Sequence, residues 1–189
     1  MLANELADAL RGREVIRASI DGFHRPRDER NRLGSDSPEG YYRDSFDLDA
    51  LRRELLEPLG PSGSRLYRAA VFDFRTDAPV EAPGRRARDD AVLVFDGVVL
   101  LRAEIRDDWD LSIFVRVAPE ESLGRALRRD LKLFGSTEEI ERRYRTRYLP
   151  GQQLYLADAD PTARADFVLD NDCPEQPRLS QPCPRDSPC

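Results

Sequence analysis

Short apolar runs that alternate with helix-like segments constrain the fold of this chain more than any other feature. Residues 91–95 (AVLVF) form a continuous apolar run, and residues 111–117 (LSIFVRV) form another. Such runs are typical of strands that are buried on both faces of a parallel sheet. A third run, residues 14–20 (EVIRASI), predicts a strand near the start of the chain. Because helical patterns separate these runs, we predict an α/β fold with a parallel sheet and flanking helices.

The remaining elements follow from periodicity and turn residues. Leu2, Leu6 and Leu10 recur four residues apart and predict a helix over residues 2–10. The other predicted elements are helices over residues 46–56, 120–131 and 138–148 and strands over residues 65–74 and 166–169. Residues 25–44 and 76–90 are polar and rich in turn residues, so we expect loops there.

Composition limits the organisation and the partners of the chain. Its 189 residues fit one domain, which we expect to span residues 1–171. A net charge of −6 argues against general binding to nucleic acid. No apolar run approaches the length of a membrane span and no signal-peptide pattern opens the chain, so we expect a cytoplasmic protein without a membrane partner. Composition leaves the oligomeric state open.

The tail over residues 172–189 differs from the rest of the chain. It contains five prolines and no periodic apolar pattern, which predicts disorder. All three cysteines, Cys173, Cys183 and Cys189, lie in this tail. Their odd number and spacing fit neither a disulfide framework nor a zinc site, so we expect reduced thiols.

Two acidic residues end two of the predicted strands. Asp21 follows residues 15–20 and Asp96 follows residues 92–95, and a glycine comes next in both cases. Ligands of open α/β sheets bind beyond the carboxyl ends of the strands. A carboxylate at that place can accept the proton of a hydroxyl group or hold Mg²⁺, the two acidic tasks of phosphoryl transfer. Alternatively, an Asp-Gly pair simply makes a tight turn out of a strand.

The order of several motifs resembles the uridine kinase and phosphoribulokinase type of P-loop kinases. The motifs are Ile20-Asp21-Gly22-Phe23-His24, Asp44-Ser45-Phe46-Asp47, Val71-Phe72-Asp73-Phe74, Val94-Phe95-Asp96-Gly97, Ile113-Phe114-Val115, the helix from Leu123 to Asp130, and Ala165-Asp166-Phe167-Val168. They cover nearly all of residues 2–171 in the order of that family. The resemblance implies a uridine kinase-like domain over residues 1–171.

The resemblance also implies roles for individual residues. Asp21 matches the catalytic carboxylate, Asp96 an acidic residue near Mg²⁺, and Arg129 a lid arginine that contacts the phosphates of ATP, with Arg125 as a neighbour in the same role. Substrate-binding positions on the acceptor side fall at Tyr41, Asp44, Phe74 and Asp77. His24 lies three residues after Asp21; it contacts the acceptor, orients Asp21, or is a packing or surface histidine.

The chain lacks the phosphate-binding loop of this family. That loop needs a lysine after a glycine-rich turn, because its backbone N–H groups cradle the phosphates and the lysine reaches the β and γ oxygens. Lys132 is the only lysine, and no glycine precedes it in Leu131-Lys132-Leu133. By resemblance, Leu2–Leu10 is the helix that follows this loop, so we expect an N-terminally truncated form that lacks the first, central strand of the sheet.

The resemblance thus implies an ATP- and Mg²⁺-dependent kinase for a hydroxyl of uridine, cytidine or another small metabolite, inactive as residues 1–189 stand. Two alternatives remain open. One is a kinase for a different acceptor, such as pantothenate or a sugar. The other is a non-catalytic protein that keeps a small-molecule pocket.

Overall fold

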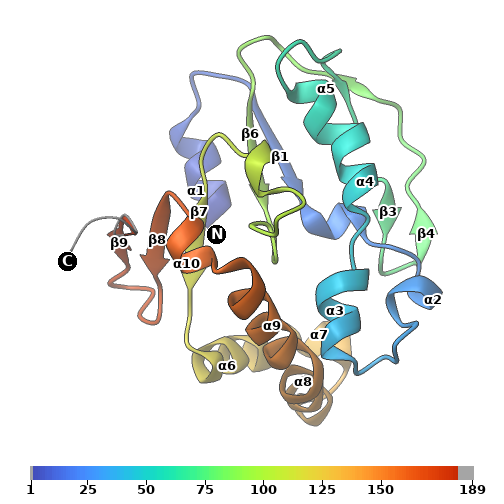
Figure 1. Cartoon of the computed structure of the whole chain (residues 1–189), viewed down its shortest axis with the longest axis vertical. Helices are drawn as coiled ribbons and strands as arrows, with labels where there is room; N and C mark the ends of the chain where they lie inside the picture. Colours follow the sequence, from blue (N-terminus) through green and yellow to red (C-terminus); the bar gives the residue numbers. More distant parts are fainter. Residues whose placement is uncertain (1, 183–189) are drawn as a thin grey trace. The chain divides into compact units, whose positions relative to one another are not determined.

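The computed structural model describes residues 2–182, and these residues form two compact units. The first unit contains the chain up to Leu33 together with Arg43–Val98. The second contains Gly34–Tyr42 and the chain from Val99 onward. Both units mix helices and strands (Figure 1). Within residues 2–182, every helix is too short or too polar to cross a lipid bilayer.

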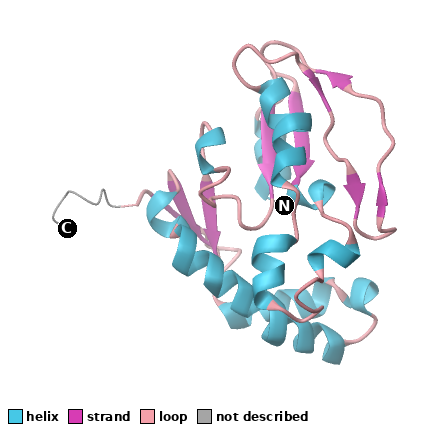
Figure 2. Ribbon diagram, turned by 45° about the vertical axis from the view of Figure 1, so that its right-hand side comes forward, coloured by secondary structure: helices cyan, strands magenta, loops and turns pink. Residues whose placement is uncertain are grey.

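A pair of parallel strands forms the centre of the first unit. Strand β1 (Val15–Ser19) runs beside β6 (Val92–Asp96), and the pairing extends from Val15 opposite Val92 to Ser19 opposite Asp96 (Figures 1 and 2). Helix α1 (Leu2–Ala9) contacts β6. The predictions of a helix over residues 2–10 and of strands over residues 14–20 and 91–95 are confirmed, with shifts of one or two residues at their ends.

One continuous helical stretch contributes buried apolar residues to the first unit. It consists of α4 (Leu48–Leu51), the π-helical turn η2 (Arg52–Leu56) and α5 (Glu57–Leu59). Its N-terminus is capped by the Asp47 carboxylate, which accepts a hydrogen bond of 2.9 Å from the Ala50 amide. Leu51 and Leu55, four residues apart on one face, are fully buried.

Very short strands occupy residues 66–86. The pairs are β2 (Leu66–Tyr67) with β5 (Arg85–Arg86) and β3 (Phe72–Asp73) with β4 (Ala78–Pro79), both antiparallel. The predicted strand over residues 65–74 is therefore wrong as one element. Arg68 donates its amide to Glu54 and Val71 donates to Gly22, so residues 68–71 bond to other segments instead of continuing a ladder.

The second unit contains a three-stranded sheet. Strand β8 (Phe167–Asp170) lies between β7 (Ile113–Arg116), to which it is parallel, and β9 (Arg178–Ser180), to which it is antiparallel (Figure 2). The amide and hydroxyl of Ser112 both donate to Asp166 Oδ2, at 2.7 and 2.8 Å. This clamp lies directly before both parallel strands and fixes their register.

The helices of the second unit gather around one apolar cluster. The buried members are Leu123, Ala126, Ile140, Tyr144 and Leu149. Residues 137–159 form one helical stretch, in which residues 144–148 are a π-helical turn between two α-helical segments. The helices of the unit are α3 (Pro38–Asp44, of which the last two residues belong to the first unit), α6 (Pro119–Arg129), α7 (Leu131–Phe134), α8 (Thr137–Arg143), η4 (Tyr144–Tyr148), α9 (Leu149–Ala159) and α10 (Pro161–Arg164), with a 3₁₀ turn η3 (Arg106–Asp108).

Three further expectations are corrected. Residues 25–44 are not one loop, because they contain α2 (Arg27–Arg30) and α3, which starts at Pro38. The tail was expected to be disordered, but within its described part residues 178–180 form β9, which pairs with β8. Residues 183–189, with Cys183 and Cys189, lie outside the described residues. The apolar residues of β6 and β7 are only half-buried or exposed, because each strand has a single neighbour.

Candidate functional site

The two predicted acids lie at the same end of the β1–β6 pair. Asp96 is the last residue of β6 and is paired in register with Ser19, the last residue of β1. Asp21 follows in the 3₁₀ turn η1 (Ile20–Phe23), which continues directly from β1. Both acidic side chains therefore come at the carboxyl ends of parallel strands, where open α/β sheets bind ligands.

The carboxylate of Asp21 is accessible. The Asp21 amide donates to Ser19 Oγ at 3.3 Å, and this bond caps the turn and fixes the backbone of Asp21. The residue is exposed, and among residues 2–182 no hydrogen bond or ion pair engages its carboxylate. A hydroxyl group of a ligand can therefore reach this carboxylate without displacing a protein group.

Beside Asp21, His24 lies between two phenylalanine rings. The His24 ring centroid is 4.6 Å from that of Phe46 and 4.8 Å from that of Phe74. An isolated antiparallel bridge joins the backbones of His24 and Phe46. His24 Nδ1 lies 3.1 Å from the carbonyl oxygen of Asp21, so in this geometry Nδ1 carries the proton and donates it. The arrangement ties the aromatic group directly to the turn that carries Asp21.

Asp77 is joined to this aromatic group through Arg30. Asp77 has a left-handed backbone with φ of 56°, and its Oδ1 accepts from the Arg27 amide at 3.0 Å and from Arg30 Nη2 at 3.2 Å. The same Arg30 nitrogen lies 3.4 Å from the carbonyl oxygen of Phe74. The structure thus brings His24, Phe74 and Asp77 together, and in it the Asp77 carboxylate holds the start of α2.

Asp96 is bound by a neighbouring cation. Arg17, in the middle of β1, places Nη2 2.6 Å from Asp96 Oδ1, and its Nη1 donates to the carbonyl oxygen of Val94. The magnesium sites of phosphoryl-transfer enzymes use one or two carboxylates together with substrate phosphates and water. Among residues 2–182 no three His, Cys, Asp or Glu side chains come together to hold a metal, and the single carboxylate at Asp96 already has a positive partner. The residues present therefore do not fit Mg²⁺ as they stand.

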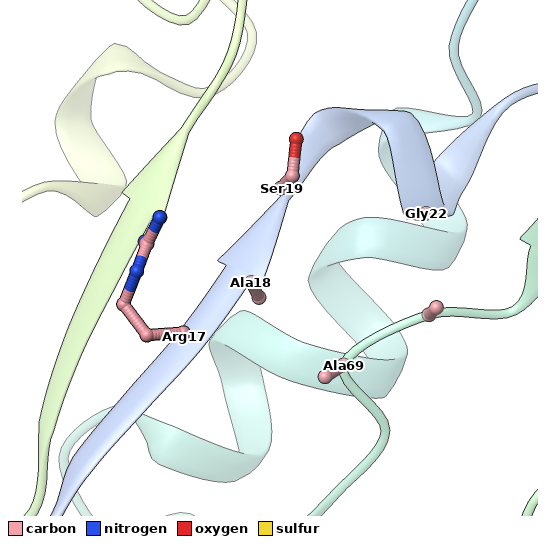
Figure 3. Close-up of a pocket in the computed structure, with 6 residues that line it drawn as sticks. Arg17, Ala18, Ser19, Gly22 and Ala69 are labelled. Carbon is pink, nitrogen blue, oxygen red and sulfur yellow. The ribbon is translucent and has the colours of Figure 1, made fainter. Parts of the chain in front are cut away.

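A pocket of about 360 Å³ opens at the end of β1. It is lined by Arg17, Ala18, Ser19, Gly22, Ala69 and Ala70. Figure 3 shows Arg17 extending between β1 and β6 and the Ser19 hydroxyl at the tip of β1. The side chains of its wall are small except for Arg17. Asp21 lies between the lining residues Ser19 and Gly22 in the chain.

Asp44, in the first unit, is largely buried. Its Oδ2 has no hydrogen-bond partner among the described residues, and Arg32 Nη2 lies 3.6 Å away. Tyr41 belongs to the second unit, where its ring meets that of Tyr148 edge-on at 5.0 Å. Tyr41 also lies against Gly151, at which an added Cβ would come within 2.5 Å of the Tyr41 ring.

Both predicted lid arginines lie on α6 in the second unit and are engaged by protein groups. Arg125 donates to Glu121 at 2.8 Å and to the carbonyl oxygen of Asn171 at 2.6 Å, which ties α6 to the end of β8. Arg129 binds both oxygens of Asp130, at 2.6 and 2.8 Å, and this contact raises the pKa of its guanidinium above the ordinary value. Both guanidinium groups thus bind protein oxygens through Nε and Nη2.

The structure resembles several solved structures. It matches a possible uridine kinase from Bacillus stearothermophilus with a TM-score of 0.66 and 24% identity, over 88% of this chain and 79% of that one. It matches the phosphoribulokinase from Rhodobacter spheroides with a TM-score of 0.57 and 19% identity, over 89% and 64% of the two chains. The protein YGR205w matches with a TM-score of 0.59 and 14% identity, over 95% and 83%. The chain has the fold of the P-loop kinases. No protein-family model matches its sequence.

Sequence reasoning missed Arg17, Arg30 and Phe46 as members of the site. Arg17 carried a usable signal, since a charged residue in the middle of the apolar run EVIRASI needs a partner. The parallel register that places Asp96 beside it is a long-range property. Arg30 looked like one of many arginines in a polar loop, and only its burial beside Asp77 distinguishes it.

Proposed function

We propose that this chain provides the acceptor side and the lid of an ATP-dependent phosphotransferase that acts on a hydroxyl group of a nucleoside or a similar small metabolite. The observation that carries the proposal is the accessible Asp21 carboxylate at the carboxyl end of β1, tied through its carbonyl oxygen to the His24 ring between Phe46 and Phe74. The P-loop kinase fold supports it. Uridine or cytidine is the acceptor to test first; pantothenate and sugars follow.

In the proposed reaction Asp21 accepts the proton of the acceptor hydroxyl while that oxygen attacks the γ-phosphorus of ATP. The bond from the γ-phosphorus to the β,γ-bridging oxygen breaks, and ADP leaves. A flat base or ring of the acceptor packs against the aromatic group of His24 and Phe74, because stacked rings gain from burial and from their complementary edges and faces. His24 donates from Nδ1 to the carbonyl oxygen of Asp21, and this bond holds the ring beside Asp21.

Arg125 and Arg129 would supply positive charge to the transferred phosphoryl oxygens. A guanidinium can bind two such oxygens at once, and negative charge on these oxygens favours the contact. Arg129 is the more accessible candidate, because its partner Asp130 is the adjacent residue and 71% of the Arg129 side chain is exposed. Arg125 is held between α6 and the end of β8, and its release would disturb both.

The test of the proposal compares Asp21→Asn with the unchanged residue in a chain extended by a phosphate-binding loop. If Asp21 is the base, the substitution lowers the rate by about 10²–10⁴-fold, the usual contribution of a general base. ATP binding should change little, because Asp21 touches the acceptor. Exposed Asp49→Asn on α4 is the control, because it makes the same chemical change away from Asp21. A full rate in Asp21→Asn returns Asp21 to the role of a turn residue.

The second candidate function is a non-catalytic protein that binds a small molecule. The ion pair of Asp96 with Arg17 favours it, because the residues present there do not fit the Mg²⁺ that a kinase uses. The two functions separate in one experiment on residues 1–189 and on the extended chain. Acceptor binding by both forms with no ADP production by either identifies a binding protein, whereas production of ADP and phosphorylated acceptor by the extended form identifies a kinase.

A further inference from the structure

Arg17 is anchored by three groups on two elements, α1 and β6. Its Nη2 lies 2.6 Å from Asp96 Oδ1, its Nη1 donates to the carbonyl oxygen of Val94, and its Nε lies 3.4 Å from Asn4 Oδ1 on α1. The guanidinium therefore spans from β1 to the carboxyl end of β6 (Figure 3). Every nitrogen of the fork has a partner, so the geometry of the group is fixed.

Asp96 gains a partner but stays accessible. The exposed fraction is 49% for the Asp96 side chain and 31% for the Arg17 side chain. A cation from solvent can therefore reach the Asp96 carboxylate. There it is repelled by the positive charge of Arg17, which is hydrogen-bonded to Asp96 Oδ1. Among the described residues, no cluster of acids offers it further ligands.

We infer that Arg17 is the resident cation of Asp96 and that it keeps divalent metal ions away from the end of β6. The physical reason is charge. A guanidinium held at 2.6 Å neutralises the carboxylate, and a divalent ion that replaces it has to displace Arg17 from three anchors or bind against its positive charge. This conclusion differs from the magnesium role that the family resemblance implies for Asp96.

The inference does not depend on phosphoryl transfer, because it concerns a metal ion and the free protein. It predicts that the carboxylate binds metal only after Arg17 is made neutral. Arg17→Met keeps a long side chain along the strand and removes the charge. Arg17→Lys retains a positive charge that can still reach Asp96, so the Asp96 carboxylate should not bind metal in that variant.

The experiment is a Mn²⁺ titration of ¹⁵N-labelled protein, read from the paramagnetic broadening of the amide signals of Phe95, Asp96 and Gly97. Wild type and Arg17→Lys should show no selective broadening there. Arg17→Met should show it, with an affinity for Mn²⁺ raised on the order of tenfold because the repulsion at close range is removed. Addition of Asp96→Asn to Arg17→Met should abolish it. Arg11→Met is the matched control, since Arg11 is an exposed arginine 3.8 Å from Asp8 on α1 and its loss changes the net charge equally.

Selective broadening of these amides in wild type overturns the inference. So does an Arg17→Met protein that behaves like Arg11→Met, since Arg17 would then not control the site. If Arg17→Met fails to fold, the comparison of wild type with Asp96→Asn decides the question. The inference is supported if the Mn²⁺ titrations of wild type and Asp96→Asn coincide. It is contradicted if the amide signals broaden selectively in wild type and not in Asp96→Asn.

Discussion

The two glycines that follow the strand-end acids owe their presence to packing. A Cβ at Gly97 would lie 2.7 Å from the Cβ of Ile20, and one at Gly22 would lie 2.8 Å from the Cβ of Ala70. Ile20 is 1% exposed and has no room to retreat. The glycine after Asp96 therefore lets the end of β6 approach the turn that carries Asp21. Close approach, and not only the tight turn considered from the sequence, explains the Asp-Gly pairs.

Gly97→Ala should destabilise the protein by about 1–3 kcal/mol, the usual cost of overpacking a core. The measurement is the free energy of unfolding from urea titrations followed by circular dichroism. Gly12→Ala is the control, because a Cβ there meets nothing within 4 Å and the backbone of Gly12 does not lie in the left-handed region. We expect that control to change stability by less than about 1 kcal/mol. Equal urea midpoints for the two variants would show that the Ile20 side chain shifts at little cost in stability.

Among the elements, α8 shows how local pairs hold a short helix. Ser136 caps it by accepting from the Glu139 amide at 3.2 Å. The Glu139 carboxylate binds Arg142 at 2.9 Å and also contacts Arg143, at i+3 and i+4 on the helix. These hydrogen bonds lower the pKa of Glu139 from its ordinary 4.5 to about 2. The acid thus stabilises the first turn of α8, which carries the buried Ile140 of the second unit's core.

Glu139→Gln should reduce the dependence of stability on pH in the acid range. Because the pKa of Glu139 is lower in the folded chain, its stabilising effect is present above pH 4.5 and is lost as the pH falls toward about 2. The variant lacks this group, so its melting temperature should fall less than that of wild type between these two values. Thermal melts at a series of pH values measure the difference. Exposed Glu57→Gln on α5 is the control and should follow wild type.

The elements also show what the sequence could predict. The strands around Val92 and Ile113 and the helix at Leu123 were predictable because their apolar patterns are local. Helix α3 was missed because Pro38 and Gly40 indicate a loop, although proline is favoured in the first turn of a helix. Strand β9 was missed because Arg178–Ser180 has no apolar period, and its pairing to β8 supplies its conformation. The contacts of Arg17 and Arg30 depend on register and burial, which no local pattern encodes.

At the scale of the whole molecule, each unit has a parallel strand with one unpaired edge. Val92 donates its amide to Glu14, so the N–H and C=O groups of residues 92, 94 and 96 face β1 and those of 93 and 95 face away. The Phe167 amide donates to the carbonyl oxygen of Ser112, and the Asn171 amide donates to that of Arg116. The N–H and C=O groups of residues 113 and 115 therefore face away from β8. Among the described strands, β6 pairs only with β1, and β7 only with β8.

Water can satisfy these edges, because Val115 is 39% exposed and β6 is half-buried, so the unpaired groups need not unfold the chain. Exposed apolar edges nevertheless pair with other chains. We therefore expect residues 1–189 to associate in solution, with an apparent mass that rises with concentration in analytical ultracentrifugation. Addition of the strand and phosphate-binding loop that the family resemblance places before this chain should suppress the association, since a new parallel strand would cover such an edge.

Val115→Lys tests whether an edge is responsible, because a lysine on an edge strand opposes further pairing. The variant should shift the protein toward the monomer at a given concentration and leave its far-ultraviolet circular dichroism unchanged. Leu133→Lys is the matched control: it replaces an exposed apolar residue, 51% accessible, with the same charge, but on helix α7. If both variants reduce association equally, net charge and not the strand edge is the cause. If wild type is already a monomer at every concentration, water alone satisfies the edges of β6 and β7, and neither sheet needs a further strand to stay in solution.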